Sequence, residues 1–266
     1  MKLSFTKLSG AGNDFIIIDN RNRSIQLSSL QIRELCARGT GIGADGLILV
    51  EPSTLYDFSM VYHNSDGFLG SMCGNGGRCA AWFAFSIRIP GRRDNSYRFE
   101  ANGNPYDAWI TSHETVKLRM LAPEEFRNDL TIEGFVCHSV NTGSPHVITY
   151  VSDLDNVKVN ESGRSIRHRT DIFSEGTNVN FIQINSQDSL SIRTFERGVE
   201  NETLACGTGA VAAALMSYRL GKIGRTTIRV KVRSGDTLQV QFSEKMDEVF
   251  LIGPAKIVYE GNIIIP

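Results

Sequence analysis

The sequence lacks three features that would each direct it to a particular class of protein. No apolar run approaches the roughly 20 residues that a membrane-spanning helix needs, so no membrane partner is expected. Lys and Arg number 28 against 29 Asp and Glu, and a net charge of −1 offers no field for nucleic acid. The chain does not open on the apolar stretch of a signal peptide, so a cytoplasmic location is expected.

The five cysteines also exclude several kinds of site. None stands at the two-residue spacing of redox or zinc motifs, and a disulfide scaffold is not expected in a cytoplasmic chain of this size. Cys73 and Cys79 are too far apart for a zinc pair, and no second Cys/His cluster follows at ligand spacing, so no metal is expected. No motif of a Schiff-base lysine is present, and no cofactor is expected.

Two of the cysteines stand in matching glycine motifs, CGNGG at 73–77 and CGTGA at 206–210. Each motif leads into a small, alanine-containing segment that predicts the start of a helix. Two matched thiols, one in each half of a chain, can place an acid and a base on opposite faces of one carbon atom. Such a pair could invert a stereocentre without a cofactor.

The spacing of these motifs, 133 positions, recurs along the chain. It relates three further pairs of segments: Gly10 with Gly143, Gly43 with Gly176, and 62–64 with 195–197. Four anchors in the same order predict two copies of one unit, each of roughly 125 residues. We expect a first half at 1–114, completed by a C-terminal strand at 255–266, and a second half at 115–254.

Most of the remaining sequence predicts strands, because apolar and polar residues alternate, as at Phe58, Met60 and Tyr62. Helices are expected only where this alternation stops, and the two that follow the cysteine motifs are nearly free of charge, which is typical of buried helices. We therefore expect an α/β (α+β) fold of two pseudo-symmetric domains. Each is an antiparallel sheet or barrel wrapped around a central helix.

The helix boundaries follow from caps and breakers. Ser28 and Ser29 predict the start of a helix that runs to Arg38. The two central helices are expected at about 76–87 and 209–220. The basic stretch 164–169 is interpreted as a solvated loop.

A cysteine at the start of a helix is chemically special. The unpaired backbone N–H groups and the helix dipole lower the pKa of a thiol there, often to between ~3.5 and ~7.5 from ~8.5. The same N–H groups can bind a carboxylate. A cysteine at a tight turn can instead be a small apolar residue, but duplication of Cys73 and Cys206 at matched positions favours the reactive role.

The sequence resembles the diaminopimelate epimerase family over essentially its whole length. The resemblance rests on these motifs: GAGNDF at 10–15, GIGAD at 41–45, NSDG at 64–67, MCGNG at 72–76, PH at 145–146, NVNF at 178–181, FERG at 195–198 and ETLACGTG at 202–209. The resemblance implies interconversion of LL- and meso-diaminopimelate without pyridoxal phosphate, for lysine and peptidoglycan synthesis. A homodimer acting on this small-molecule amino acid is expected.

The resemblance also implies roles for individual residues. Cys73 and Cys206 would be the acid and the base. The reacting carboxylate would be held by the backbone N–H groups of four residues: Gly74, Asn75, Gly207 and Thr208. Arg197 suits the distal carboxylate of the substrate, because a guanidinium binds carboxylate in a bidentate fork.

The other expected contacts are polar side chains. Glu196 can pair with an ammonium group and raise the pKa of a nearby thiol, and His146 can tune the opposite thiol. Three amides can donate to a carboxylate and accept from an ammonium group: Asn13, Asn64 and Asn178. Two positions depart from the family pattern, where Gln and Asn are common: Gly46 and Ser144.

Two alternatives remain at this stage. A proline or hydroxyproline racemase, or a related phenazine-pathway isomerase, would share the cysteine pair, but proline has no distal carboxylate for Arg197 to hold. A thiol redox or ligand-binding protein could use the same cleft, which is expected around the two cysteines. Such a protein would not need the Arg and Asn groups. The breadth of substrates, given Gly46 and Ser144, does not follow from the sequence.

Overall fold

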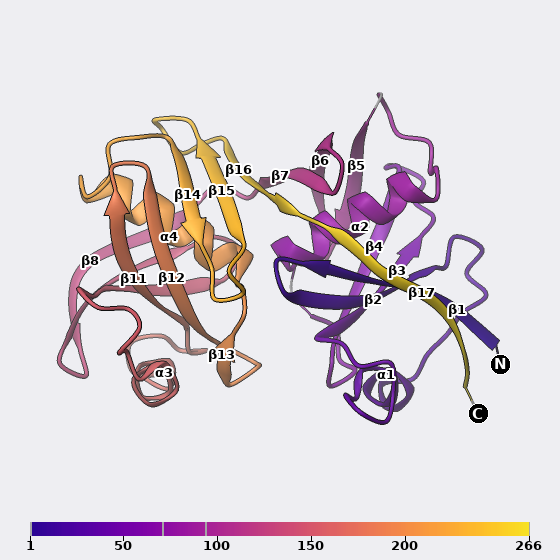
Figure 1. Ribbon diagram of the computed structural model, residues 1–266, viewed down its shortest axis with the longest axis horizontal. Helices are drawn as coiled ribbons and strands as arrows, with labels where there is room; N and C mark the ends of the chain where they lie inside the picture. Colours follow the sequence, from indigo (N-terminus) through magenta and orange to yellow (C-terminus); the bar gives the residue numbers. More distant parts are fainter. Residues whose placement is uncertain (1, 71, 94, 266) are drawn as a thin grey trace. The chain divides into compact units, whose positions relative to one another are not determined.

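The computed structural model describes residues 2–70, 72–93 and 95–265. The chain divides into unit 1, Met1–Arg119 with Gly253–Pro266, and unit 2, Met120–Ile252. Figure 1 shows strands around a helix in each unit. The assignment of 1–114 with 255–266 and of 115–254 as two functional halves stays a prediction.

Unit 1 is a mixed sheet around α2. Its strands are β1 (Lys2–Gly10), β2 (Asn13–Asp19), β3 (Gly46–Glu51), β4 (Phe58–Asn64), β5 (Ser96–Ala101), β6 (Asn104–Ser112), β7 (Thr115–Met120) and β17 (Lys256–Ile264). Its helices are α1 (Ser29–Cys36) and α2 (Gly74–Ser86). Neighbours pair in the order β17-β1-β2-β3-β4-β5-β6-β7, so the C-terminal strand lies against β1.

Unit 2 repeats this order of elements. Its strands are β8 (Glu124–Ile132), β9 (Phe135–Asn141), β10 (Pro145–Tyr150), β11 (Asn178–Ser186), β12 (Ser189–Glu196), β13 (Asn201–Thr203), β14 (Thr227–Lys231), β15 (Thr237–Phe242) and β16 (Val249–Pro254). Its helices are α3 (Val159–Arg167) and α4 (Gly207–Arg219). The pairing order is β8-β9-β10-β11-β12-β14-β15-β16, with β13 beside β12.

The expected α/β (α+β) class is confirmed, with one correction to the expected antiparallel sheets. Most pairs are antiparallel, but β2–β3 and β4–β5 are parallel in unit 1, as are β10–β11 and β12–β14 in unit 2. A parallel pair needs a crossover connection. Each of these four pairs has one, because a helix lies between its two strands in the chain order.

The central helices α2 and α4 begin two residues earlier than expected, at Gly74 and Gly207. Both run for 13 residues, and both are buried along most of their length, as their lack of charge predicts. Ser28 caps α1 and its side chain accepts from the Gln31 backbone N–H, although this helix ends at Cys36 rather than Arg38.

The interpretation of 164–169 as a solvated loop is wrong for 164–167, because α3 extends to Arg167. The buried side of α3 carries Val159, Gly163 and Ile166. A Cβ at Gly163 would lie 2.4 Å from the Cβ of Phe195, so α3 packs directly on β12. Glycine is a poor helix former, which hid this helix in the sequence.

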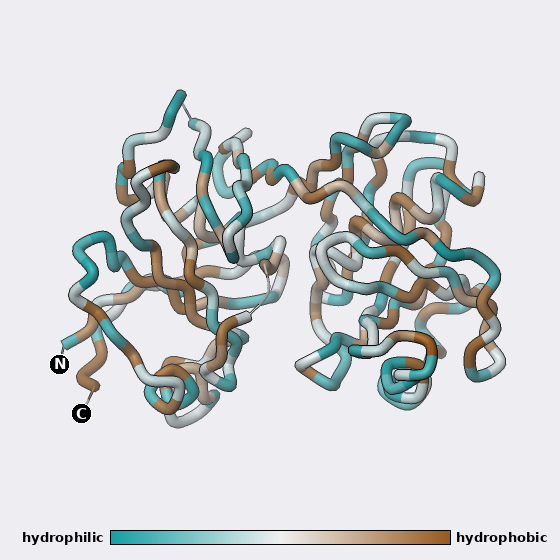
Figure 2. The backbone as a smooth tube through the Cα atoms, turned by 180° about the vertical axis from the view of Figure 1, so that it is seen from behind, coloured by the Kyte–Doolittle hydropathy of each residue, from teal (hydrophilic) through white to brown (hydrophobic). Residues whose placement is uncertain are grey.

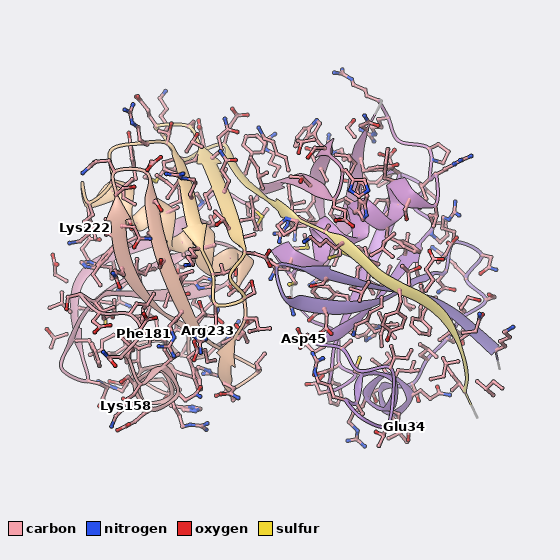
Figure 3. The ribbon with its side chains drawn as sticks, in the orientation of Figure 1. Glu34, Asp45, Lys158, Phe181, Lys222 and Arg233 are labelled. Carbon is pink, nitrogen blue, oxygen red and sulfur yellow. The ribbon has the colours of Figure 1, made fainter. Side chains whose placement is uncertain are left out.

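The cores of both units are built from the strands and the central helices α2 and α4. Figure 2 shows hydrophobic stretches along strands in each unit and hydrophilic stretches at many of the loops. In Figure 3, Phe181 lies within unit 2, where it is fully buried, and Lys222 projects from the same unit. Among residues 2–70, 72–93 and 95–265, no helix is both long enough and apolar enough to cross a membrane.

Candidate active site

The two motif cysteines are the N-cap residues of the central helices. Cys73 precedes α2 with φ −102° and ψ 118°, and Cys206 precedes α4 with φ −116° and ψ 113°. Neither side chain forms a cap hydrogen bond with its own helix. Each sulfur therefore lies at the positive end of a buried helix dipole, which favours the thiolate.

In unit 1, the Asn13 side chain contacts both Cys73 and Asn75, at the start of α2. The Asn13 Oδ1 lies 3.4 Å from the Cys73 Sγ and 3.3 Å from the Asn75 Nδ2. The Asn13 Nδ2 donates to Asp45 Oδ2 at 2.6 Å. The structure thus brings together three of the candidate residues, Asn13, Cys73 and Asn75.

A network of charged residues supports this cluster. The Arg38 guanidinium bridges Asp14 and Asp45, with N–O distances of 2.7 Å to each carboxylate, and Lys7 pairs with Asp14 at 2.8 Å. Figure 3 labels Asp45 in unit 1. Burial raises the pKa of Asp14, but hydrogen bonds from Arg38 and Lys7 outweigh it and hold this pKa below its ordinary value. Both aspartates lie in motifs of the sequence, yet sequence reasoning gave them no role.

Sequence reasoning also gave no role to Arg78, a fully buried cation in the first turns of α2. Its guanidinium donates to Gly74 O at 3.2 Å and to Asn75 Oδ1 at 3.0 Å. These bonds fix the Asn75 side chain. A charge inside an otherwise apolar helix was the signal that could have identified it.

Asn64 contacts other residues than those of the Asn13 cluster. It ends β4, where its backbone N–H donates to Phe68 O at 2.9 Å, and it pairs in register with Gly46. A Cβ at Gly46 would lie 2.5 Å from both His63 O and Tyr62 Cε2. The Tyr62 ring therefore fills the space beside Gly46, and no side chain fits there.

In unit 2, His146 is fully buried among hydroxyl groups. Its Nε2 lies 3.0 Å from both Ser144 Oγ and Thr208 Oγ1. The Thr208 Oγ1 lies in turn 3.5 Å from the Cys206 Sγ. Burial, together with the charge of Arg197, lowers the pKa of His146 to about 3, so this imidazole is neutral near pH 7.

Behind His146 lies Asn180, a buried residue of β11 that sequence reasoning did not assign to the site. Its Nδ2 lies 3.2 Å from His146 Nδ1 and donates to Val147 O at 2.8 Å. Its Oδ1 accepts from the Thr194 hydroxyl at 2.9 Å. Asn180 lies in the NVNF motif at 178–181, but only its hydrogen-bond partners show that it orients His146.

The remaining candidates lie where β11 begins and β12 ends, because Asn178 is the first residue of β11 and Glu196 is the last of β12. The Asn178 Oδ1 accepts from the Arg197 backbone N–H at 2.9 Å, and the Glu196 Oε2 accepts from the Thr203 hydroxyl at 2.8 Å. The Arg197 guanidinium is partly exposed and lies 3.6 Å from the Glu175 carboxylate. Arg197 can therefore exchange this exposed partner for another carboxylate.

The other cysteines are buried away from these contacts. Burial raises the pKa of Cys36 and of Cys79 to about 12, and it also raises that of Cys137. These thiols are neutral near pH 7, as expected for structural residues. Within the described ranges, no group of three or more His, Cys, Asp or Glu side chains could hold a metal ion.

Known proteins resemble this chain over nearly its whole length. The sequence profile described as diaminopimelate epimerase matches residues 5–122 and 138–258. A diaminopimelate epimerase of Chlorobaculum tepidum is 58% identical over 96% of this chain and 99% of its own length. One from Aquifex aeolicus is 40% identical over 98% of each chain.

More distant solved structures share the fold alone. A Bacillus anthracis phenazine biosynthesis protein of the PhzF family has a TM-score of 0.73 at 15% identity, with both chains fully covered. A probable proline racemase from Agrobacterium radiobacter, with bound carbonate, has a TM-score of 0.74 at 11% identity, covering 99% of this chain and 93% of its own.

Proposed function

The chain belongs to the diaminopimelate epimerase family of isomerases, and we propose that it interconverts LL- and meso-diaminopimelate by a two-base mechanism. Cys73 and Cys206 are the two acid/base residues. The observation that carries this proposal is their shared position, since each caps a buried central helix in its own unit. The two motifs thus supply two equivalent thiols in one chain.

In this mechanism one thiolate removes the α-proton, and the opposite thiol returns a proton to the other face of the carbon. The gap between the acidity of the α-proton and that of a thiol exceeds about 10 pKa units, or about 14 kcal/mol. Fixed dipoles in a dry site can stabilise the charge that develops. We assign this task to backbone N–H groups at the two helix starts, which belong to Gly74, Asn75, Gly207 and Thr208.

The remaining contacts select the substrate. Arg197 holds the distal carboxylate, and Glu196 pairs with an ammonium group and raises the pKa of a nearby thiol. The amides of Asn13, Asn64 and Asn178 complete the contacts. His146 tunes the thiol of Cys206.

The biological setting follows from the proposed reaction. The product would serve lysine and peptidoglycan synthesis. We propose that the protein acts as a cytoplasmic homodimer and needs neither pyridoxal phosphate nor a metal.

The test compares substrates. Chiral chromatography should detect conversion of LL-diaminopimelate but not of L-proline or trans-4-hydroxy-L-proline. Arg197→Met should lower kcat/KM for diaminopimelate more than a hundredfold, about 2.7 kcal/mol. The control Arg229→Met removes an exposed cation paired with Asp188 and should leave kcat/KM unchanged. A fall of less than tenfold in Arg197→Met, or turnover of proline, would instead favour the racemase alternative.

A further inference from the structure

The two sulfurs face hydrogen-bond partners of opposite polarity. Building on the proposed two-base function, we propose that the free enzyme carries the thiolate on Cys206 and the proton on Cys73. The Thr208 hydroxyl, oriented by His146, which Asn180 orients in turn, donates to the sulfur in unit 2. The Asn13 carbonyl accepts from the sulfur in unit 1.

The chain of donors in unit 2 begins at Asn180. Its Nδ2 faces the Val147 carbonyl oxygen at 2.8 Å, which can only accept. Its Oδ1 accepts from the Thr194 hydroxyl. The orientation of this amide is therefore fixed from both sides, and its second N–H points to His146 Nδ1 at 3.2 Å.

A donor at Nδ1 determines the state of His146. The imidazole is neutral, because burial in unit 2 lowers its pKa to about 3. A neutral ring has one N–H, and since Nδ1 accepts from Asn180, the proton is on Nε2. His146 is thus a fixed donor toward the hydroxyls of Ser144 and Thr208, each 3.0 Å away.

This donor turns the Thr208 hydroxyl toward sulfur. When Thr208 Oγ1 accepts from His146 Nε2–H, its own hydrogen is free to point at the Cys206 Sγ, 3.5 Å away. Ser144 supports this direction. Its oxygen accepts from Asn178 Nδ2, so its own hydrogen can point at Thr208 Oγ1, 3.5 Å away, and the Thr208 hydrogen then points elsewhere. A hydroxyl that donates to sulfur stabilises the thiolate over the thiol.

The arrangement in unit 1 is the reverse. Asn13 Nδ2 donates to the Asp45 carboxylate at 2.6 Å, and a carboxylate can only accept. The amide is therefore oriented with Oδ1 toward the Cys73 Sγ, at 3.4 Å. An oxygen that can only accept favours S–H over a thiolate, so Asn13 holds the proton on Cys73.

The internal repeat makes this a matched comparison. At the offset of 133 positions, Asn13 corresponds to His146 and Asn75 to Thr208. In unit 1, Asn13 presents an acceptor to the sulfur of Cys73. In unit 2, Thr208 presents a donor to the sulfur of Cys206. Side chains therefore set which cysteine carries the proton in the free enzyme, while the two helix starts are alike.

Charged groups near the two cysteines affect the protonation of the sulfurs less directly than the hydrogen bonds do. They are Lys7, Asp14, Arg38, Asp45 and Arg78 in unit 1, and Glu196 and Arg197 in unit 2. Lys7 and Arg38 pair with the two aspartates, and Arg78 favours an anion near α2. Coulomb attraction weakens with distance, whereas the two hydrogen bonds act in contact with sulfur, so we expect the hydrogen bonds to decide.

The test measures the pH dependence of alkylation of each cysteine. The full-length protein is reduced, freed of reductant and treated briefly with iodoacetamide at pH 5 to 10, and peptide mass spectrometry then quantifies each thiol. The midpoint of a rate–pH profile reports the thiol pKa independently of access. The midpoint of Cys206 should lie at least one pH unit below that of Cys73.

Three variants at threonines isolate the hydroxyl. Thr208→Val should raise the Cys206 midpoint by about one to two pH units and leave that of Cys73 in place. Thr208→Ser should retain the low midpoint. Thr149→Val is the matched control, because Thr149 Oγ1 contacts the sulfur of Cys137 at 3.0 Å and should not affect Cys206.

The outcomes separate this inference from the proposed function. A lower midpoint for Cys73 than for Cys206, or no shift in Thr208→Val, would overturn the assignment of the proton. Neither result would touch the two-base mechanism, which is tested separately by whether Cys73→Ala or Cys206→Ala still epimerises diaminopimelate. If Thr208→Val does not fold, the Asn180→Leu variant provides a second test, since it should raise the same midpoint, and an unchanged midpoint there would also overturn the assignment.

Discussion

At the residue scale, the proposed site depends on two amide side chains. The orientation of each is fixed by a partner that can accept a hydrogen bond but cannot donate one. Asp45 orients Asn13, and the Val147 carbonyl orients Asn180. Neither amide can rotate without placing an oxygen against an oxygen, which costs a buried hydrogen bond. The polarity of each cluster is therefore a property of the folded chain and does not depend on substrate.

Keeping His146 neutral lowers the free energy of unfolding at acidic pH, and this loss can be measured. Its folded pKa, about 3, lies below the value of about 6.5 in an unfolded chain. Between these values the unfolded state binds more protons, so stability falls as the pH decreases from 6.5 toward 3. The slope is at most about 1.36 kcal/mol per pH unit, or about 2 kcal/mol between pH 6.5 and 5.

Urea unfolding of wild type and His146→Gln at pH 7, 6 and 5 tests this cost. The variant should lose less stability than wild type on acidification, because it has no buried imidazole to protonate. His113→Gln changes an exposed histidine that contacts the Trp82 ring and should keep the wild-type slope. An identical slope in His146→Gln and wild type would show that the buried imidazole does not remain neutral.

At the element scale, the start of α4 is packed against β11 through a glycine. A Cβ at Gly209 would lie 2.5 Å from Asn180 Oδ1 and 3.3 Å from the Cys206 Sγ. Helix propensity alone predicts that alanine here would stabilise α4 by about 1 kcal/mol. The contact predicts the opposite sign, because the Asn180 oxygen already accepts from Thr194.

Gly209→Ala should therefore destabilise the protein by about 1 to 3 kcal/mol in urea unfolding and lower activity. Gly224→Ala is the control, since a Cβ there would approach only the flexible end of Gln187 and should change stability by less than about 0.5 kcal/mol. A stabilised Gly209→Ala variant would mean that α4 can shift away from Asn180 without loss.

The same elements illustrate how far the sequence reaches. The starts of α2 and α4 could be predicted within two residues, because glycine motifs and uncharged apolar segments are local signals. The helix α3 could not, because Gly163 is there to let α3 approach Phe195, a partner 32 positions away. The roles of Asp45 and Asn180 were hidden for the same reason, since they depend on contacts between distant segments.

At the scale of the whole molecule, the repeat is preserved in architecture more than in side chains. The strands of both units pair in one order, with β13 added in unit 2, and α2 and α4 have the same length at the expected offset. Distant structures with 10 to 15% identity keep this fold at TM-scores of 0.72 to 0.74. The architecture of the units is therefore kept although few residues are shared.

The most direct test of the two-base mechanism follows single turnovers of LL-diaminopimelate in heavy water. Product formed early should carry deuterium at the inverted α-carbon, while recovered LL substrate should not, because the base that removes the proton differs from the acid that returns one. Cys73→Ala and Cys206→Ala should each abolish this turnover. Rapid entry of deuterium into unreacted LL substrate would reveal a single base and contradict the assignment of Cys73 and Cys206 as an opposed pair.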